Sequence, residues 1–114
     1  MVRSISGLKI TDLVLGEGAL AEKGKIATIH YRSFLNRGEP FRSSYDLPEP
    51  VYVYIGSRRD IAGLEKGIVG MRVGGKRRIK ISPHLAYQNR AVPGIPANAA
   101  LIFEVELMDI QDAE

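Results

Sequence analysis

Two aromatic residues in the C-terminal third of the chain are placed where they could form an apolar cup with one polar group. Tyr87 closes a turn that begins with Ser82-Pro83, and Phe103 lies in the strand-like segment 101–107. A tyrosine on a proline-bounded turn and a phenylalanine on a buried strand supply apolar walls and one hydroxyl. The pair predicts a small binding pocket, with the alternative that Tyr87 is a core tyrosine whose hydroxyl is hydrogen-bonded internally.

Residue types that carry metal, thiol or nucleophilic chemistry are scarce. The chain has no cysteine and only His30 and His84, so we expect no disulfide, no thiolate chemistry, no metal site and no cofactor. Ser43-Ser44 has no base positioned near it in the sequence. Gly74-Gly75 is not followed by the Gly-Lys-Ser/Thr of a phosphate loop. We interpret the histidines as structural or solvated and the glycines as turn residues.

Length and composition fit one compact domain. The 114 residues are 45% hydrophobic, enough for a single core, and 16 Lys+Arg against 13 Asp+Glu leave a net charge of +3. That charge is too small to indicate nucleic-acid binding. No apolar run approaches the roughly 20 residues that span a bilayer, and the N-terminus lacks the apolar stretch of a signal peptide. We expect one domain over 1–114 with its core at about 7–111, monomeric and cytoplasmic, with no membrane partner.

Four segments alternate apolar and polar residues as half-buried strands do. They span residues 7–15, 25–36, 76–82 and 100–110. We interpret the stretch between about Gly38 and Asp60 as irregular.

One short helix is predicted over residues 61–69. Ile61, Leu64 and Ile68 recur there at helical spacing, Asp60 can cap its N-terminus, and Gly70 ends it. A helix of about two turns is marginal alone, so its apolar stripe must pack on the sheet. The predicted fold class is α+β: an antiparallel curled β-sheet wrapped around one short α-helix.

A basic cluster lies in the third extended segment. Its members are Lys76, Arg77, Arg78 and Lys80. It could contact nucleic acid or an acidic partner, but no aromatic residues interleave it, as stacking on single-stranded nucleic acid would need. We interpret it as a solvated strand face opposite Glu104 and Glu106, with which it could pair across strands.

The order of these parts resembles the FKBP-type peptidyl-prolyl cis/trans isomerases, the macrolide-binding immunophilins, from about residue 7 to residue 110. The matching motifs are, in chain order, His30-Tyr31; Phe41 with Ser43-Ser44; Ile61, Gly63, Leu64, Glu65 and Gly67; Gly70-Met71 with Val73-Gly74; Ile81-Ser82-Pro83; Ala86-Tyr87; Pro93-Gly94-Ile95-Pro96; and residues 103–107. Several spaced motifs in the right order are far more specific than any one of them alone.

The resemblance implies an aromatic pocket that binds proline-containing polypeptides. Its walls would be Tyr31, Phe41, Tyr87 and Phe103, and its floor Leu64. The backbone N–H matching Ile61 and the Tyr87 hydroxyl would hold substrate carbonyls while the prolyl bond turns. Residues of this kind can belong to the core and to the site at once, because the wall of the cup is the outer layer of the core.

Two departures from the family pattern concern residues that would bind a ligand. Leu64 stands where the family usually has tryptophan, and Arg42 stands where it commonly has an acidic residue that accepts a hydrogen bond at the pocket. We expect these two residues to lower activity and to weaken macrolide binding.

Further departures lie at the rim of the pocket. Val51 replaces a second phenylalanine, Asp60 replaces an apolar residue, and the loop after Tyr87 lacks the family's usual glycine and rim histidine. The residues assigned to substrate binding are Arg42, Val51, Asp60, Val92 and Ile95.

We therefore predict a peptidyl-prolyl cis/trans isomerase, or rotamase, that acts on X-Pro bonds and assists protein folding as a chaperone. The alternative is a catalytically weak FKBP-like binding module that holds a protein partner with the same cup or with the basic face. Arg42, Asp60 and Val92 motivate this alternative, because each alters a pocket edge. A third function, nucleic-acid binding, would show an affinity that falls steeply with salt, and the modest net charge argues against it.

Overall fold

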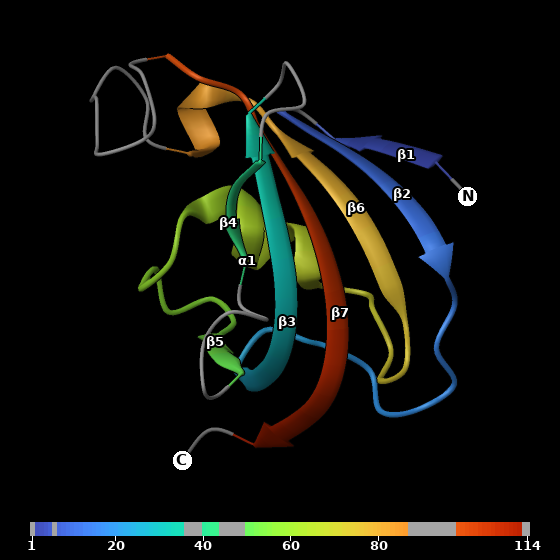
Figure 1. Cartoon of the computed structure of the whole chain (residues 1–114). Helices are drawn as coiled ribbons and strands as arrows, with labels where there is room; N and C mark the ends of the chain where they lie inside the picture. Colours follow the sequence, from blue (N-terminus) through green and yellow to red (C-terminus); the bar gives the residue numbers. More distant parts are fainter. Residues whose placement is uncertain (1, 6, 36–39, 44–49, 87–97, 113–114) are drawn as a thin grey trace.

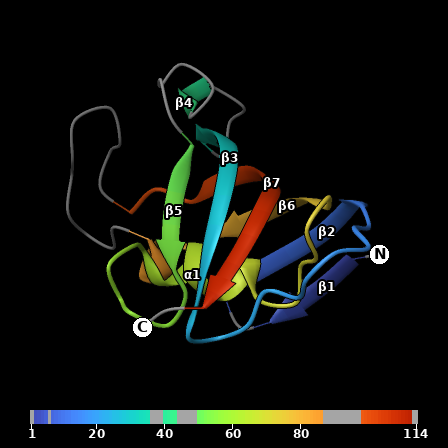
Figure 2. The ribbon, with the colours of Figure 1, turned by 90° about the horizontal axis from the view of Figure 1, so that it is seen from below.

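A computed structural model of the chain shows an antiparallel sheet of seven strands, within the described residues, curled around one short helix (Figures 1 and 2). The described residues are 2–5, 7–35, 40–43, 50–86 and 98–112, with the backbone alone for 2–5 and 40–43. The predicted fold class is thereby confirmed.

The long strands in the middle of the sheet set its shape. The strands are β1 (Val2–Ile5), β2 (Leu8–Val14), β3 (Lys25–Leu35), β4 (Pro40–Ser43), β5 (Val51–Tyr54), β6 (Lys76–Ile81) and β7 (Leu101–Asp112). Their order is β1-β2-β6-β7-β3-β4, and β5 also pairs with β3. In Figure 1 β3 and β7 run side by side through the centre of the sheet.

The four predicted strands are β2, β3, β6 and β7, each confirmed to within two residues at either end. The prediction of an irregular stretch between Gly38 and Asp60 is wrong in two places, because β4 and β5 lie within it. Each of these strands is four residues long, too short for a period of two to stand out. They form by pairing with the long strand β3.

The helix α1 (Ala62–Ile68) packs directly on β6 because two of its residues have no side chain on that face. A Cβ built on Gly63 would lie 2.3 Å from Ile81 Cγ2, and one on Gly67 would lie 2.7 Å from Ile79 Cδ1. Such distances lie well inside normal contact, so these glycines permit the close approach of helix and sheet. Nothing helical in the described part of the chain is long and apolar enough to cross a membrane.

The ends of α1 differ in part from the prediction. The N-cap is Ile61, with extended backbone, and no side chain caps the helix, so the predicted capping role of Asp60 is wrong. Asp60 instead donates its backbone N–H to Glu65 Oε2, which lies inside the helix's first turns. The helix ends at Ile68 with Val69 as its C-cap. Gly70, which was predicted to end it, follows with a φ of +92° that is readily adopted only by glycine.

Arg77 does not belong to the solvated face of β6. Its side chain is 3% exposed; Nε lies 2.6 Å from Asp12 Oδ1, and Nη1 donates to the carbonyls of Gly67 and Val69 at 2.9 and 3.0 Å. A buried guanidinium therefore joins β2 and β6 to the C-terminal end of α1.

The other basic residues of β6 point outward, as strand alternation predicts. Lys76, Arg78 and Lys80 are exposed, and Arg78 pairs with Glu104 of β7 at 2.6 Å. The predicted cross-strand pairing is confirmed for this pair.

Candidate functional site

Two rings from neighbouring strands form the most distinctive apolar contact of the core. Tyr31 of β3 lies opposite Val105, and Phe103 of β7 lies opposite Ser33, so the two aromatic residues are diagonal neighbours across the ladder. Their ring centroids are 5.4 Å apart and the rings are tilted by 42°. Diagonal neighbours lie within reach of aromatic side chains, and a tilted pair is favourable beyond its buried area.

Leu64 of α1 belongs to the same core cluster as this ring pair. Tyr31, Phe103 and Leu64 are 8%, 7% and 5% exposed. The structure thus places three residues that the sequence assigned to one pocket in one buried core cluster, and Tyr31 and Phe103 in direct contact.

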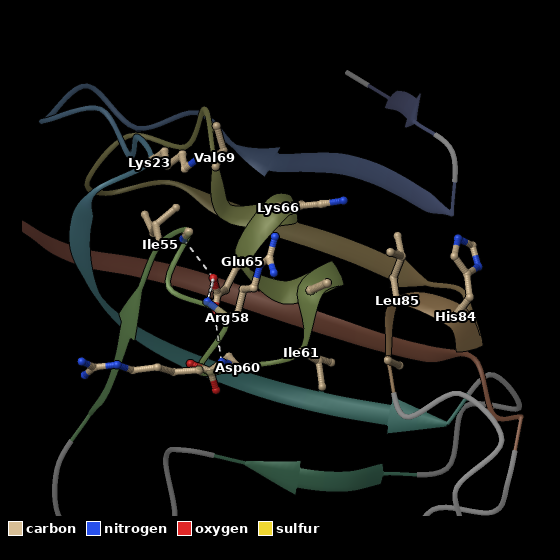
Figure 3. Close-up of a pocket in the computed structure, with 14 residues that line it drawn as sticks. Lys23, Ile55, Arg58, Asp60, Ile61, Glu65, Lys66, Val69, His84 and Leu85 are labelled. Carbon is tan, nitrogen blue, oxygen red and sulfur yellow. Dashed lines mark hydrogen bonds between the residues drawn. The ribbon is translucent and has the colours of Figure 1, made fainter.

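An open hollow of about 800 Å³ lies beside this cluster, along the outer side of α1 (Figure 3). The ring pair and Leu64 do not line it. Ile61, Leu85 and Ala86 do, and these three also pack against the core cluster. These three half-buried apolar residues therefore border both the hollow and the core.

The backbone of Ile61 offers a hydrogen-bond donor at this boundary. Its carbonyl accepts the N–H groups of Leu64 at 3.1 Å and Glu65 at 3.3 Å. Its own N–H has no partner among the described residues. A backbone N–H group that is covered by a ligand nearly always pairs with an acceptor. A ligand that covers Ile61 would therefore be expected to offer a carbonyl to this N–H.

Glu65 holds the loop that leads into Ile61. The side chain is 5% exposed, and Oε1 accepts the backbone N–H groups of Gly56 at 2.9 Å and Arg58 at 3.1 Å, while Oε2 accepts that of Asp60 at 2.8 Å (Figure 3). Hydrogen bonds to a carboxylate are stronger than neutral ones. Three of them fix residues 56–60, including Arg58 in a left-handed conformation with φ of +66°.

The sequence analysis quoted Glu65 in a motif and gave it no role. The signal that could have found it is an acidic residue on the packed side of the helix, next to Leu64. A buried carboxylate needs donors, and the backbone of the preceding loop is the nearest source.

Two predicted rim residues lie near the boundary of the site. Asp60 lines the hollow and is half-buried, and burial, followed by the Glu65 carboxylate, raises the pKa of its carboxyl. Val51 opens β5, pairs with Ile29 and packs half-buried against the core.

The remaining predicted site residues are only partly described. Phe41 and Arg42 lie in β4, where Arg42 pairs with Ser33, so the backbone of β4 lies beside the aromatic strand β3. Their side chains are not described. The residues predicted for the site that fall outside the described ranges are Tyr87, Val92 and Ile95.

Both histidines have surroundings that the sequence analysis anticipated only in part. His30 is half-buried and lies opposite Glu106, and His84 is exposed in the 3₁₀ helix η2 (Pro83–Leu85), where it lines the hollow. Within the described ranges, no three residues of the metal-ligating types lie close enough together to hold a metal ion.

Comparisons with known proteins agree with this geometry. Residues 17–108 match the family model of the FKBP-type peptidyl-prolyl cis-trans isomerases. The chain is 41% identical over 115 residues to FK506-binding protein 1A of Neurospora crassa, covering 99% of this chain and 96% of that protein. It is 43% identical over 110 residues to FK506-binding protein 4 of Aspergillus fumigatus, but spans only 22% of that longer protein. The crystal structure of FkpA from Escherichia coli superposes with a TM-score of 0.89 at 33% identity, covering 99% of this chain and 53% of that one.

Proposed function

The chain belongs to the FKBP-type peptidyl-prolyl cis-trans isomerase family, and we propose that it accelerates the cis/trans isomerisation of X-Pro bonds in polypeptides and so assists their folding. The observation that carries the proposal is the contact of Tyr31 with Phe103, in the same core cluster as Leu64. Ile61, whose N–H has no partner among the described residues, packs against this cluster. An apolar cluster next to one such donor suits a prolyl peptide, which is apolar at the ring and polar at the flanking carbonyls.

The reaction needs no nucleophile and no base. Rotation about the X-Pro bond has a barrier of about 20 kcal/mol because amide resonance must be broken. In the planar ground state the amide oxygen carries more charge and is better hydrated than in the twisted state. A site that strips water from the amide therefore destabilises the ground state more than the twisted state.

Each residue has a distinct part in this scheme. Tyr31 and Phe103 exclude water, Leu64 supplies the floor, and the Ile61 N–H donates to a substrate carbonyl so that the peptide is fixed while the prolyl bond turns. Phe41 and Tyr87 join the site on the strength of the family motifs that they match, Tyr87 with its hydroxyl as a second donor.

Macrolide binding is proposed to be weaker than in relatives whose names state that they bind FK506. Leu64 offers less contact area than the tryptophan that the family usually has there. It is only 5% exposed, so little of its surface is left for a ligand to cover. A macrolide ring therefore buries less apolar surface against this floor.

Exchange NMR on short X-Pro peptides tests the proposal. We expect micromolar protein to raise the cis–trans exchange rate well above the uncatalysed rate, which is slower than once per ten seconds or so. No acceleration with a folded protein would refute the proposed activity.

The rival function is a binding module with little catalysis, and one observation favours it: the ring pair and the floor are almost entirely covered. Chemical-shift mapping with a proline peptide separates the two. Perturbations at Tyr31, Leu64 and Phe103 together with faster exchange support the isomerase. Perturbations there without faster exchange, or perturbations confined to β6, support the rival.

A further inference from the structure

Four cations surround the hollow beside the proposed prolyl site. Lys23, Arg58, Arg59 and Lys66 all line it, and all four are exposed. Within the described ranges, none of them forms a salt bridge. Figure 3 shows Lys23 near Val69 at one end of the hollow, Leu85 with His84 at the other, and Arg58 and Lys66 between them.

The acidic residues of the lining do not neutralise this charge. Only Asp60 and Glu65 are acidic among the described lining residues. Both oxygens of the buried Glu65 accept backbone N–H groups from the loop, and Asp60 is half-buried. Among the described lining residues, the exposed ionisable side chains are therefore the four cations and His84.

The backbone of Arg58 and the side chain of Arg59 are held in place before any ligand arrives. Arg58 donates its backbone N–H to Glu65 at 3.1 Å. The Arg59 guanidinium lies 4.3 Å from the centroid of the Tyr54 ring, a cation–π contact, and its backbone N–H donates to Ser57 Oγ at 3.2 Å. A preorganised cation loses less conformational freedom on binding than a free one.

We propose that this cationic rim selects clients with acidic residues close to the proline, the hollow holding an acidic stretch of polypeptide while the X-Pro bond sits at Ile61. The inference rests on the proposed function, and it adds a substrate preference to it. Each exposed charge pair contributes little, but several cations around one hollow act together and also steer an acidic chain toward the site.

The test compares three peptides that share one Leu-Pro centre and differ in flanking residues, which are Glu, Gln or Lys on both sides. The readout is kcat/KM for cis–trans exchange by NMR. At about 0.02 M salt we expect the Glu peptide to exceed the Lys peptide by about three- to tenfold, and at about 0.5 M salt we expect a ratio near one, because exposed charges are then screened.

A pair of double variants with equal charge change locates the effect. Arg58→Asn with Lys66→Gln removes two positive charges from the hollow, and asparagine tolerates the left-handed backbone at residue 58. Lys76→Gln with Lys80→Gln removes two from the outer face of β6. We expect the first variant to bring the Glu-to-Lys ratio close to one and the second to keep most of it. Equal loss in both would show a net-charge effect and overturn the proposal.

Failure of the preference and failure of the activity can be told apart. Acceleration of the Gln peptide with no preference for Glu over Lys overturns the rim proposal alone. If no peptide is accelerated, the proposed activity fails. The charge preference is then measured by titrating each peptide and following the amide chemical shifts of Arg58, Arg59 and Asp60. Tighter binding of the Glu peptide than of the Lys peptide supports the rim proposal, and equal binding overturns it. Displacement of the Glu peptide by an equally charged oligonucleotide at the same concentration would show a general anion surface and also overturn it.

Discussion

The carboxylate of Glu65 accepts the backbone N–H of Asp60 at 2.8 Å, and the next N–H along the chain, that of Ile61, has no partner among the described residues. The buried acid thus fixes the peptide unit directly before the free donor. Because Glu65 lies on α1 and α1 packs on β6, the position of that donor depends on the packing of the helix on the sheet.

Glu65→Gln is expected to loosen this arrangement. The amide keeps the size of the carboxylate, but it replaces one accepting oxygen with an NH₂ group that faces backbone donors. We expect a loss of about 1–3 kcal/mol in the free energy of unfolding and a fall of roughly tenfold in kcat/KM for a neutral X-Pro peptide. Urea unfolding and exchange NMR measure the two effects.

The matched control is Glu17→Gln, the same chemical change at an exposed residue. If the two variants have equal stability and equal activity, Glu65 does not position the loop.

Asp60→Asn is expected to stabilise the protein at neutral pH. Burial and the Glu65 carboxylate raise the pKa of Asp60 above its ordinary value of 3.8, so the folded state favours the protonated form. The stability that this group contributes is full below the unfolded pKa and is lost as the pH rises through the folded pKa. The variant should therefore exceed the natural protein in stability at about pH 7, and the difference should shrink as the pH falls toward about 4. Urea midpoints over this range measure it, and a difference that grows on acidification would contradict the burial of Asp60.

Two neighbouring arginines of β6 are expected to differ sharply. Arg77→Ala leaves Asp12, whose side chain is 10% exposed, without its partner and frees two helix carbonyls, so we expect a loss of about 3–5 kcal/mol. Arg78→Ala removes a partly exposed pair with Glu104, for which we expect about 1 kcal/mol or less. Guanidinium unfolding of both variants gives the comparison, and similar losses would contradict the inward orientation of Arg77.

Leu64→Trp is expected to tighten macrolide binding. An added indole contributes roughly 50 Å² more apolar contact, worth about 1 kcal/mol or close to a tenfold gain in affinity. The larger ring also strains a floor that is already buried, at a cost of about 1–3 kcal/mol in stability. Titration calorimetry with a proline-mimicking macrolide measures the gain. An unchanged affinity in a variant that unfolds cooperatively would place Leu64 outside the pocket.

The sequence predicted the parts of the fold whose periodicity is long enough to read. The strand 25–36 and the segment 76–82 show their buried faces in their alternation, and the structure agrees for 76–81. In β3 the alternation breaks at Thr28, which is predicted to face outward but is only 8% exposed, where the pairing with β7 shifts register. The four-residue strand β5 could not be predicted from its own residues, because its conformation depends on its pairing with β3, which is a tertiary contact. The burial of Arg77 could not be predicted for a similar reason, because its partners Asp12 and Gly67 are remote from it in the sequence.

The site divides in the same way. Tyr31, Leu64 and Phe103 could be assigned from the family motifs, because those motifs mark side chains. The hydrogen bonds that Glu65 accepts from the loop and the N–H of Ile61, which has no partner among the described residues, depend on the orientation of backbone groups. The type of a residue does not predict that orientation. The cations of the hollow come from the loop 55–60, from α1 and from Lys23, and only the folded chain brings them together.

The most direct test of the account is the cis–trans exchange rate of a neutral Leu-Pro peptide with Ile61→Pro compared with Ile61→Val. Ile61 has φ of −61°, which proline adopts naturally, so the first variant removes the N–H with little strain, while the second keeps it. We expect both to fold and the rate with Ile61→Pro to lie about tenfold below that with Ile61→Val, because a hydrogen bond to the substrate is lost. Equal rates in the two folded variants would contradict the claim that this backbone donor holds the prolyl peptide.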